Sequence, residues 1–139
     1  MLLIAMLGLI LGIVLSLALI YLAHTRPPKG ERRVYAIGLV VAALIYVGFG
    51  VIGGANARWL MIEIVGVLIY GVAAWIGLRG WTSFLALGWM AHVAWDVLLH
   101  LSGAGSEYTP DWYPWLCVSF DSVVAGAILK SIRRETSDI

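Results

Sequence analysis

Residues 2–23 read LLIAMLGLILGIVLSLALIYLA, an apolar run that contains no charged side chain. About 20 such residues form a helix long enough to cross the ~30 Å hydrocarbon core of a bilayer. The run lacks the basic start of a secretory signal peptide and exceeds the roughly 7–15 apolar residues of its core. We therefore interpret this run as a retained membrane helix.

Four further runs of similar character follow. Together the five are expected at about residues 2–23, 34–54, 59–78, 82–101 and 113–130. Pro27 and Pro28 are expected to end the first helix, because proline removes a backbone donor. The 139 residues are 62% hydrophobic and only 12% charged, whereas soluble domains carry about a quarter charged residues. The sequence therefore predicts one all-α domain over residues 1–139, a five-helix transmembrane bundle.

The basic residues gather on one side of this predicted bundle. Eight of the nine fall in the first and third loops or after the last helix: Arg26, Lys29, Arg32, Arg33, Arg79, Lys130, Arg133 and Arg134. Because short cytoplasmic loops are enriched in Lys and Arg, we expect an outside N-terminus and a cytoplasmic C-terminus in a plasma (inner) membrane. The sequence has no basic stripe with interleaved aromatic residues, so no nucleic-acid partner is expected. Membrane lipids are the expected partners.

Ionisable side chains interrupt three of the predicted helices. They are Glu63, His92, Asp96, His100 and Asp121. Each charged residue at mid-membrane costs about 2.5–3.5 kcal/mol, so such residues usually serve a function. The pattern His92-x3-Asp96-x3-His100 places three side chains within an ~80° stripe of one helix. The predicted topology puts Glu63 and Asp121 at the same depth as this stripe, in the outer half of the membrane. We therefore expect all five ionisable side chains to converge.

Three interpretations of this cluster are open. Imidazole and carboxylate ligands suit a divalent metal ion, with zinc or iron favoured. Because His92 and His100 are ~12 Å apart along the helix, two ions bridged by Asp96 and completed by Glu63 and Asp121 fit better than one. Without metal, Asp96, Glu63 and Asp121 would act as acid/base groups or as a proton path. The third interpretation is structural, with hydrogen bonds that hold the helices together.

Several further residues have two possible roles. Trp89 and Trp95 are expected as walls of a pocket beside the cluster, while Cys117 and Asn56 could join the site or serve packing and capping. Two small-residue motifs, Gly8-x3-Gly12 and Gly50-x3-Gly54, allow helices to approach closely, either within the chain or in a homo-oligomer. Packing within the chain is the favoured interpretation of both motifs.

The stretch GWMAHVAWDVLLH, residues 88–100, resembles the H-x-x-W-D helix of small uncharacterised bacterial integral-membrane proteins. The resemblance covers about a tenth of the chain; it implies a bacterial origin and assigns no activity. A five-helix bundle with histidine and acidic residues is also similar to the sterol-isomerase-type (EXPERA) fold, which implies proton shuttling, but no residue carries over.

From the ionisable cluster we expect a membrane-embedded, metal-dependent enzyme that acts on a lipid or other apolar substrate. The alternatives are a protein that binds or transports protons or metal ions, and an accessory subunit of a membrane complex.

Overall fold

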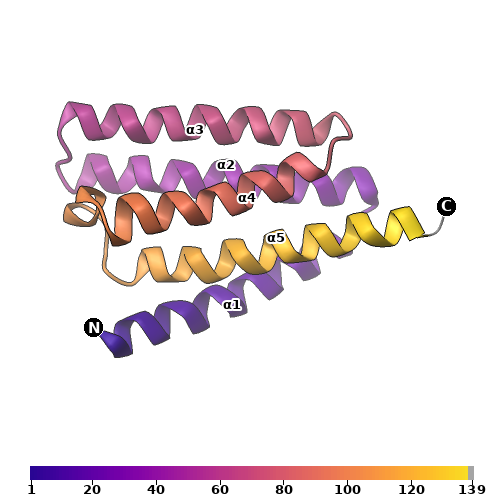
Figure 1. Ribbon diagram of the computed structural model, residues 1–139, viewed down its shortest axis with the longest axis horizontal. Helices are drawn as coiled ribbons and strands as arrows, with labels where there is room; N and C mark the ends of the chain where they lie inside the picture. The colour runs from indigo at the N-terminus through magenta and orange to yellow at the C-terminus, as the bar shows by residue number, and fades with distance from the viewer. Residues whose placement is uncertain (138–139) are drawn as a thin grey trace.

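The computed structural model describes residues 1–137 as an all-helical chain (Figure 1). Its long helices are α1 (Leu2–His24), α2 (Pro28–Ile52), α3 (Ala57–Leu78), α4 (Ser83–Trp95) and α5 (Tyr113–Ser137). Helix α4 continues as a π-helix, η1 (Asp96–Leu101), and a short 3-10 helix, η2 (Ala104–Glu107), precedes α5. Counting α4 with η1, five helices are long and apolar enough to cross a membrane, which confirms the predicted five-helix bundle.

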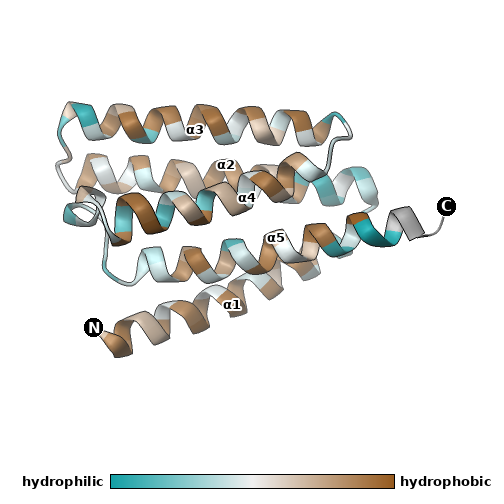
Figure 2. Cartoon of the chain, viewed as in Figure 1, coloured by the Kyte–Doolittle hydropathy of each residue, from teal (hydrophilic) through white to brown (hydrophobic). Residues whose placement is uncertain are grey.

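Successive long helices alternate in direction, so α1, α3 and α5 run one way and α2 and α4 run the other way (Figure 1). Helix α2 packs on α3, α4 lies between α3 and α5, and α5 packs on α1. The connections at residues 25–27 and 79–82 and the end of α5 therefore share one end of the bundle, which we call the basic end. The loops at residues 53–56 and 102–112 share the opposite end. Figure 2 shows hydrophilic residues at both ends and further ones along α4 and α5.

Two helix boundaries differ from those expected. Helix α2 begins at Pro28 rather than near residue 34, because a proline at the first helical position loses no hydrogen bond that the helix needs. The predicted first loop thereby shortens to residues 25–27. Helix α5 continues past residue 130 to Ser137. Much of the basic sequence therefore lies on helix ends rather than in loops.

In the turn between α2 and α3, a glycine and an asparagine shape the backbone and cap the next helix. Gly54 has a φ of +72°, a conformation that favours glycine. The Asn56 side chain accepts a hydrogen bond of 3.1 Å from the Trp59 backbone N–H and so caps α3. Asn56 is thus a cap, the expected alternative to a place in the site.

Glycines of α1 allow it to pack tightly on α5. A Cβ atom added to Gly8 would lie 2.6 Å from the Trp112 carbonyl oxygen, and one added to Gly12 would clash with the backbone of Leu116. The Ser119 hydroxyl donates a hydrogen bond of 2.9 Å across this interface to the Leu9 carbonyl. The first small-residue motif therefore serves packing within the chain.

Candidate functional site

Three ionisable side chains from α4, η1 and α5 meet inside the bundle. His92, Asp96 and Asp121 are fully buried, each with 0% exposure. The Nδ1 atom of His92 lies 2.7 Å from Asp121 Oδ2 and 3.6 Å from Asp96 Oδ2. One potential ligand atom from each residue lies within 4.8 Å of the others. We call these three residues the central triad.

The central triad carries more acid than base. Two carboxylates face one imidazole, so one negative charge is left over even when His92 is protonated. Tyr46 donates a hydrogen bond of 2.7 Å to Asp96 Oδ1, but Asp96 Oδ2 and Asp121 Oδ1 are buried without a hydrogen-bond partner. A buried anion without compensation is very unfavourable. The triad therefore requires a further cation, either a metal ion or an additional proton.

Glu63 and His100 form a second group, nearer the end of the bundle that lies opposite the basic end. Glu63 Oε1 lies 3.1 Å from His100 Nε2 and accepts a hydrogen bond of 2.6 Å from the Tyr108 hydroxyl. Its other oxygen accepts a 3.3 Å hydrogen bond from the Trp95 indole, and His100 Nδ1 lies 3.1 Å from Thr109 Oγ1. A protonated imidazole would balance the single carboxylate here. We call Glu63 and His100 the outer pair.

Tyr108 belongs to the loop that closes over the outer pair. Burial, and next the hydrogen bond with Glu63, raises the pKa of Tyr108 well above its usual value of 10. The hydroxyl is therefore protonated at neutral pH and donates to the Glu63 carboxylate. This contact ties the loop at residues 102–112 to α3.

Tyr46 of α2 connects the two groups. Its ring stacks on the His100 imidazole, with centroids 3.7 Å apart and an interplanar angle of 12°. Its hydroxyl donates to Asp96, so one side chain contacts both groups. Tyr46 was visible in the sequence only as a polar interruption of an apolar helix. Because it comes from another helix, the spacing within residues 82–101 gave no sign of its role.

The π-helix η1 explains why the predicted stripe on helix four divides into two groups. The Ser102 N–H bonds the Val97 carbonyl at 2.9 Å, which is the i to i+5 pattern of a π turn. This wider turn moves His100 away from the α-helical stripe, so it faces Glu63 while His92 and Asp96 face Asp121. Short π segments within helices are frequent at functional sites.

All five predicted site residues are thus buried in the bundle, but they form two groups rather than one. Among the side chains that the structure describes, those of residues 1–134, the central triad is the one set of three from His, Cys, Asp or Glu close enough to share a metal ion. Glu63 and His100, also predicted as ligands, lie outside that set. Cys117 is buried beside Tyr46 in a small apolar cluster.

The two tryptophans expected as pocket walls have different surroundings. Trp89 is fully buried in the hydrophobic core and lines no pocket among those described. Trp95 is partly buried, and it lines an open apolar groove of about 540 Å³ together with Arg58, Met61, Ile62 and Val65. Because its indole also contacts Glu63, Trp95 stands between this groove and the outer pair.

The fold and site define an all-helical bundle of membrane-spanning character with a buried histidine–carboxylate centre. Residues 7–133 match the model of a family of unknown function (DUF6010). The chain belongs to this family. No curated protein and no solved structure matches the chain.

Proposed function

We propose that the protein is a membrane-embedded, metal-dependent enzyme that acts on a lipid or other apolar substrate. The observation that carries the proposal is the excess of acid in the central triad, which has two buried carboxylates, one imidazole and unpartnered acceptor atoms on Asp96 and Asp121. A divalent cation would neutralise this excess. Zinc or iron suits a ligand set of one imidazole and two carboxylates.

The proposal places one ion at the central triad. His92, Asp96 and Asp121 would hold it, and it would act as a Lewis acid or activate water. The Tyr46 hydroxyl orients Asp96, as hydrogen-bonding partners of metal ligands commonly do. The outer pair needs no metal when its imidazole carries a proton, so we assign Glu63 and His100 to proton transfer beside the ion.

The groove beside Trp95 supports an apolar substrate. Its walls Met61, Ile62 and Val65 are apolar, and Arg58 lies at the end of α3 that borders the groove. A lipid can place its acyl chain against these walls and an anionic head beside the guanidinium. Movement of the Trp95 indole would then open a route from the groove to Glu63.

The proposed topology places the N-terminus outside and the C-terminus in the cytoplasm of the plasma membrane, with the basic end cytoplasmic. It is supported by the eight basic residues on that side of the chain. A fluorescent protein that folds only in the cytoplasm, fused after Ile139, is expected to fluoresce, and the same protein fused before Met1 is expected to be dark. The reverse pattern would contradict this orientation.

Elemental analysis of the purified protein tests the metal proposal. We expect stoichiometric zinc or iron in the wild type and a loss of about tenfold or more in Asp96→Asn and Asp121→Asn, since ligand removal weakens metal affinity strongly. Asp111→Asn, which changes an exposed loop aspartate, is the matched control and should keep its metal. A metal-free wild type that is folded and monodisperse would overturn the proposal.

The short contact between His92 and Asp121 favours a second candidate, metal-free acid/base chemistry. At 2.7 Å the two side chains can share one proton, and a second proton on Asp96 would supply the missing positive charge instead of a metal ion. The same elemental analysis separates the two candidates. A transport function is less well supported, because fully buried apolar residues such as Leu39, Leu85 and Ile128 fill the interior towards the basic end.

A further inference from the structure

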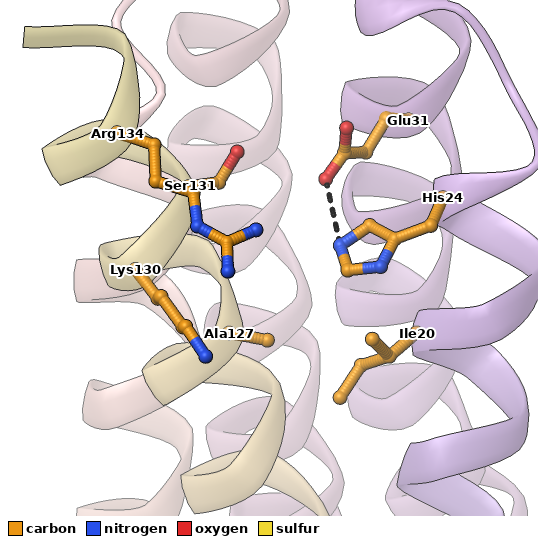
Figure 3. Close-up of a pocket in the computed structure, with 7 residues that line it drawn as sticks. All are labelled: Ile20, His24, Glu31, Ala127, Lys130, Ser131 and Arg134. Carbon is orange, nitrogen blue, oxygen red and sulfur yellow. Dashed lines mark ion pairs between the residues drawn. The ribbon is translucent and has the colours of Figure 1, made fainter.

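A second pocket lies at the basic end, on the other side of the hydrophobic core from the central triad. It has a volume of about 410 Å³ and lies between α1, the start of α2 and the end of α5 (Figure 3). Its lining residues are Ile20, His24, Glu31, Ala127, Lys130, Ser131 and Arg134. We call this hollow the basic pocket. No part of the function proposed above uses it.

The two walls of the basic pocket differ in charge. Lys130 and Arg134 project from α5 toward the opposite wall, which carries His24 and Glu31 (Figure 3). His24 Nε2 lies 3.5 Å from Glu31 Oε1, and this is the ion pair that Figure 3 draws among the lining residues. The Glu31 carboxylate is therefore engaged on its own side of the pocket. The α5 wall presents two permanent cations to whatever enters between the helices.

The basic pocket is also amphipathic along its depth. Ile20 and Ala127 form its inner, apolar part, while Ser131 and Arg134 lie nearer the helix ends (Figure 3). The candidate membrane spans Leu2–His24 and Tyr113–Arg134 both end beside this polar part, which the topology proposed above puts near the bilayer surface. A ligand that fits this gradient has an anionic head and an apolar body.

We propose that the basic pocket binds the headgroup of an anionic phospholipid. The phosphate would lie between Lys130 and Arg134, and the start of an acyl chain would lie on Ile20 and Ala127. Basic pockets between transmembrane helices are suited to such headgroups. A lipid satisfies both parts of the pocket, whereas free phosphate would leave the apolar part uncovered.

Lipid titration with native mass spectrometry tests this site. Detergent-purified protein is titrated with phosphatidylglycerol and, separately, with phosphatidylcholine. The wild type is expected to prefer phosphatidylglycerol, and Lys130→Gln/Arg134→Gln is expected to bind it about tenfold or more weakly, since each surface cation contributes to anionic-lipid binding. Both residues are exposed, so the double variant should fold; its melting temperature verifies this.

Lys29→Gln/Arg33→Gln is the matched control. It removes two exposed cations from the same end of the bundle, but neither residue lines the basic pocket. An equal loss of phosphatidylglycerol binding in this control would show a general charge effect and overturn the site. Phosphatidylglycerol binding of wild-type strength in Lys130→Gln/Arg134→Gln would also overturn the site. Competition by millimolar inorganic phosphate would assign the pocket to a soluble anion and overturn the lipid proposal.

Discussion

Replacing His92 by leucine is expected to lower the free energy of unfolding by about 3–5 kcal/mol, the usual effect of removing one partner of a buried charged pair. In the folded chain the imidazole lies between the Asp121 and Asp96 carboxylates, and all three side chains are fully buried. Without it, two acidic groups face each other with only Tyr46 as a donor to Asp96. Leucine has a similar volume, so the change is mainly electrostatic.

Unfolding in mixed detergent micelles, followed by circular dichroism, measures this effect. His24→Leu is the matched control, because the His24 side chain is 51% exposed and lies at the basic end; a change within about 0.5 kcal/mol is expected there. A His92→Leu protein as stable as this control would contradict the charge imbalance assigned to the central triad.

A chelator added to the same measurement separates a metal ion from a proton. If the wild type binds metal, removing an ion present at about 100 times its Kd lowers stability by roughly 2.7 kcal/mol. The His92→Leu protein, which lacks a ligand, should show no further loss. A wild type that does not respond to the chelator, combined with a strongly destabilised variant, would favour the metal-free candidate.

The helices were predictable because the hydrocarbon core of a bilayer offers no hydrogen-bond partners to the backbone of an apolar segment. A run such as residues 2–23 must hydrogen-bond its own backbone, and a helix does so within one segment. The boundaries were less predictable, since Pro28 can either follow a helix or begin one. The prediction of a loop at residues 24–33 assumed that Pro28 follows the first helix.

The members of the site were also predictable, because each ionisable residue within a span is unfavourable unless it has a role. Their grouping was not. A strict α-helix places His92, Asp96 and His100 on one stripe, and the sequence carries no clear signal for the π turn at Asp96–Leu101 that separates them. The partners Tyr46 and Tyr108 lie on another helix and in a loop, so their contacts depend on tertiary packing.

Gly12→Ala is expected to lower the free energy of unfolding by about 1–3 kcal/mol, although alanine is the better helix former. The added methyl group would overlap the Leu116 carbonyl and the Ser119 hydroxyl on α5. Because a helical backbone cannot yield locally, α1 must move away from α5. That movement also weakens the hydrogen bond from Ser119 to the Leu9 carbonyl.

Gly71→Ala is the matched control for this change. Gly71 lies within α3, and a Cβ atom there would meet nothing within 4 Å, so the helix propensity of alanine acts alone and stabilises by about 0.8–1 kcal/mol. Unfolding titrations in SDS would compare the two variants. Opposite signs are expected because one glycine is needed for a close approach of helices and the other is not. Equal stabilisation by both changes would show that α1 does not pack on α5 through Gly12.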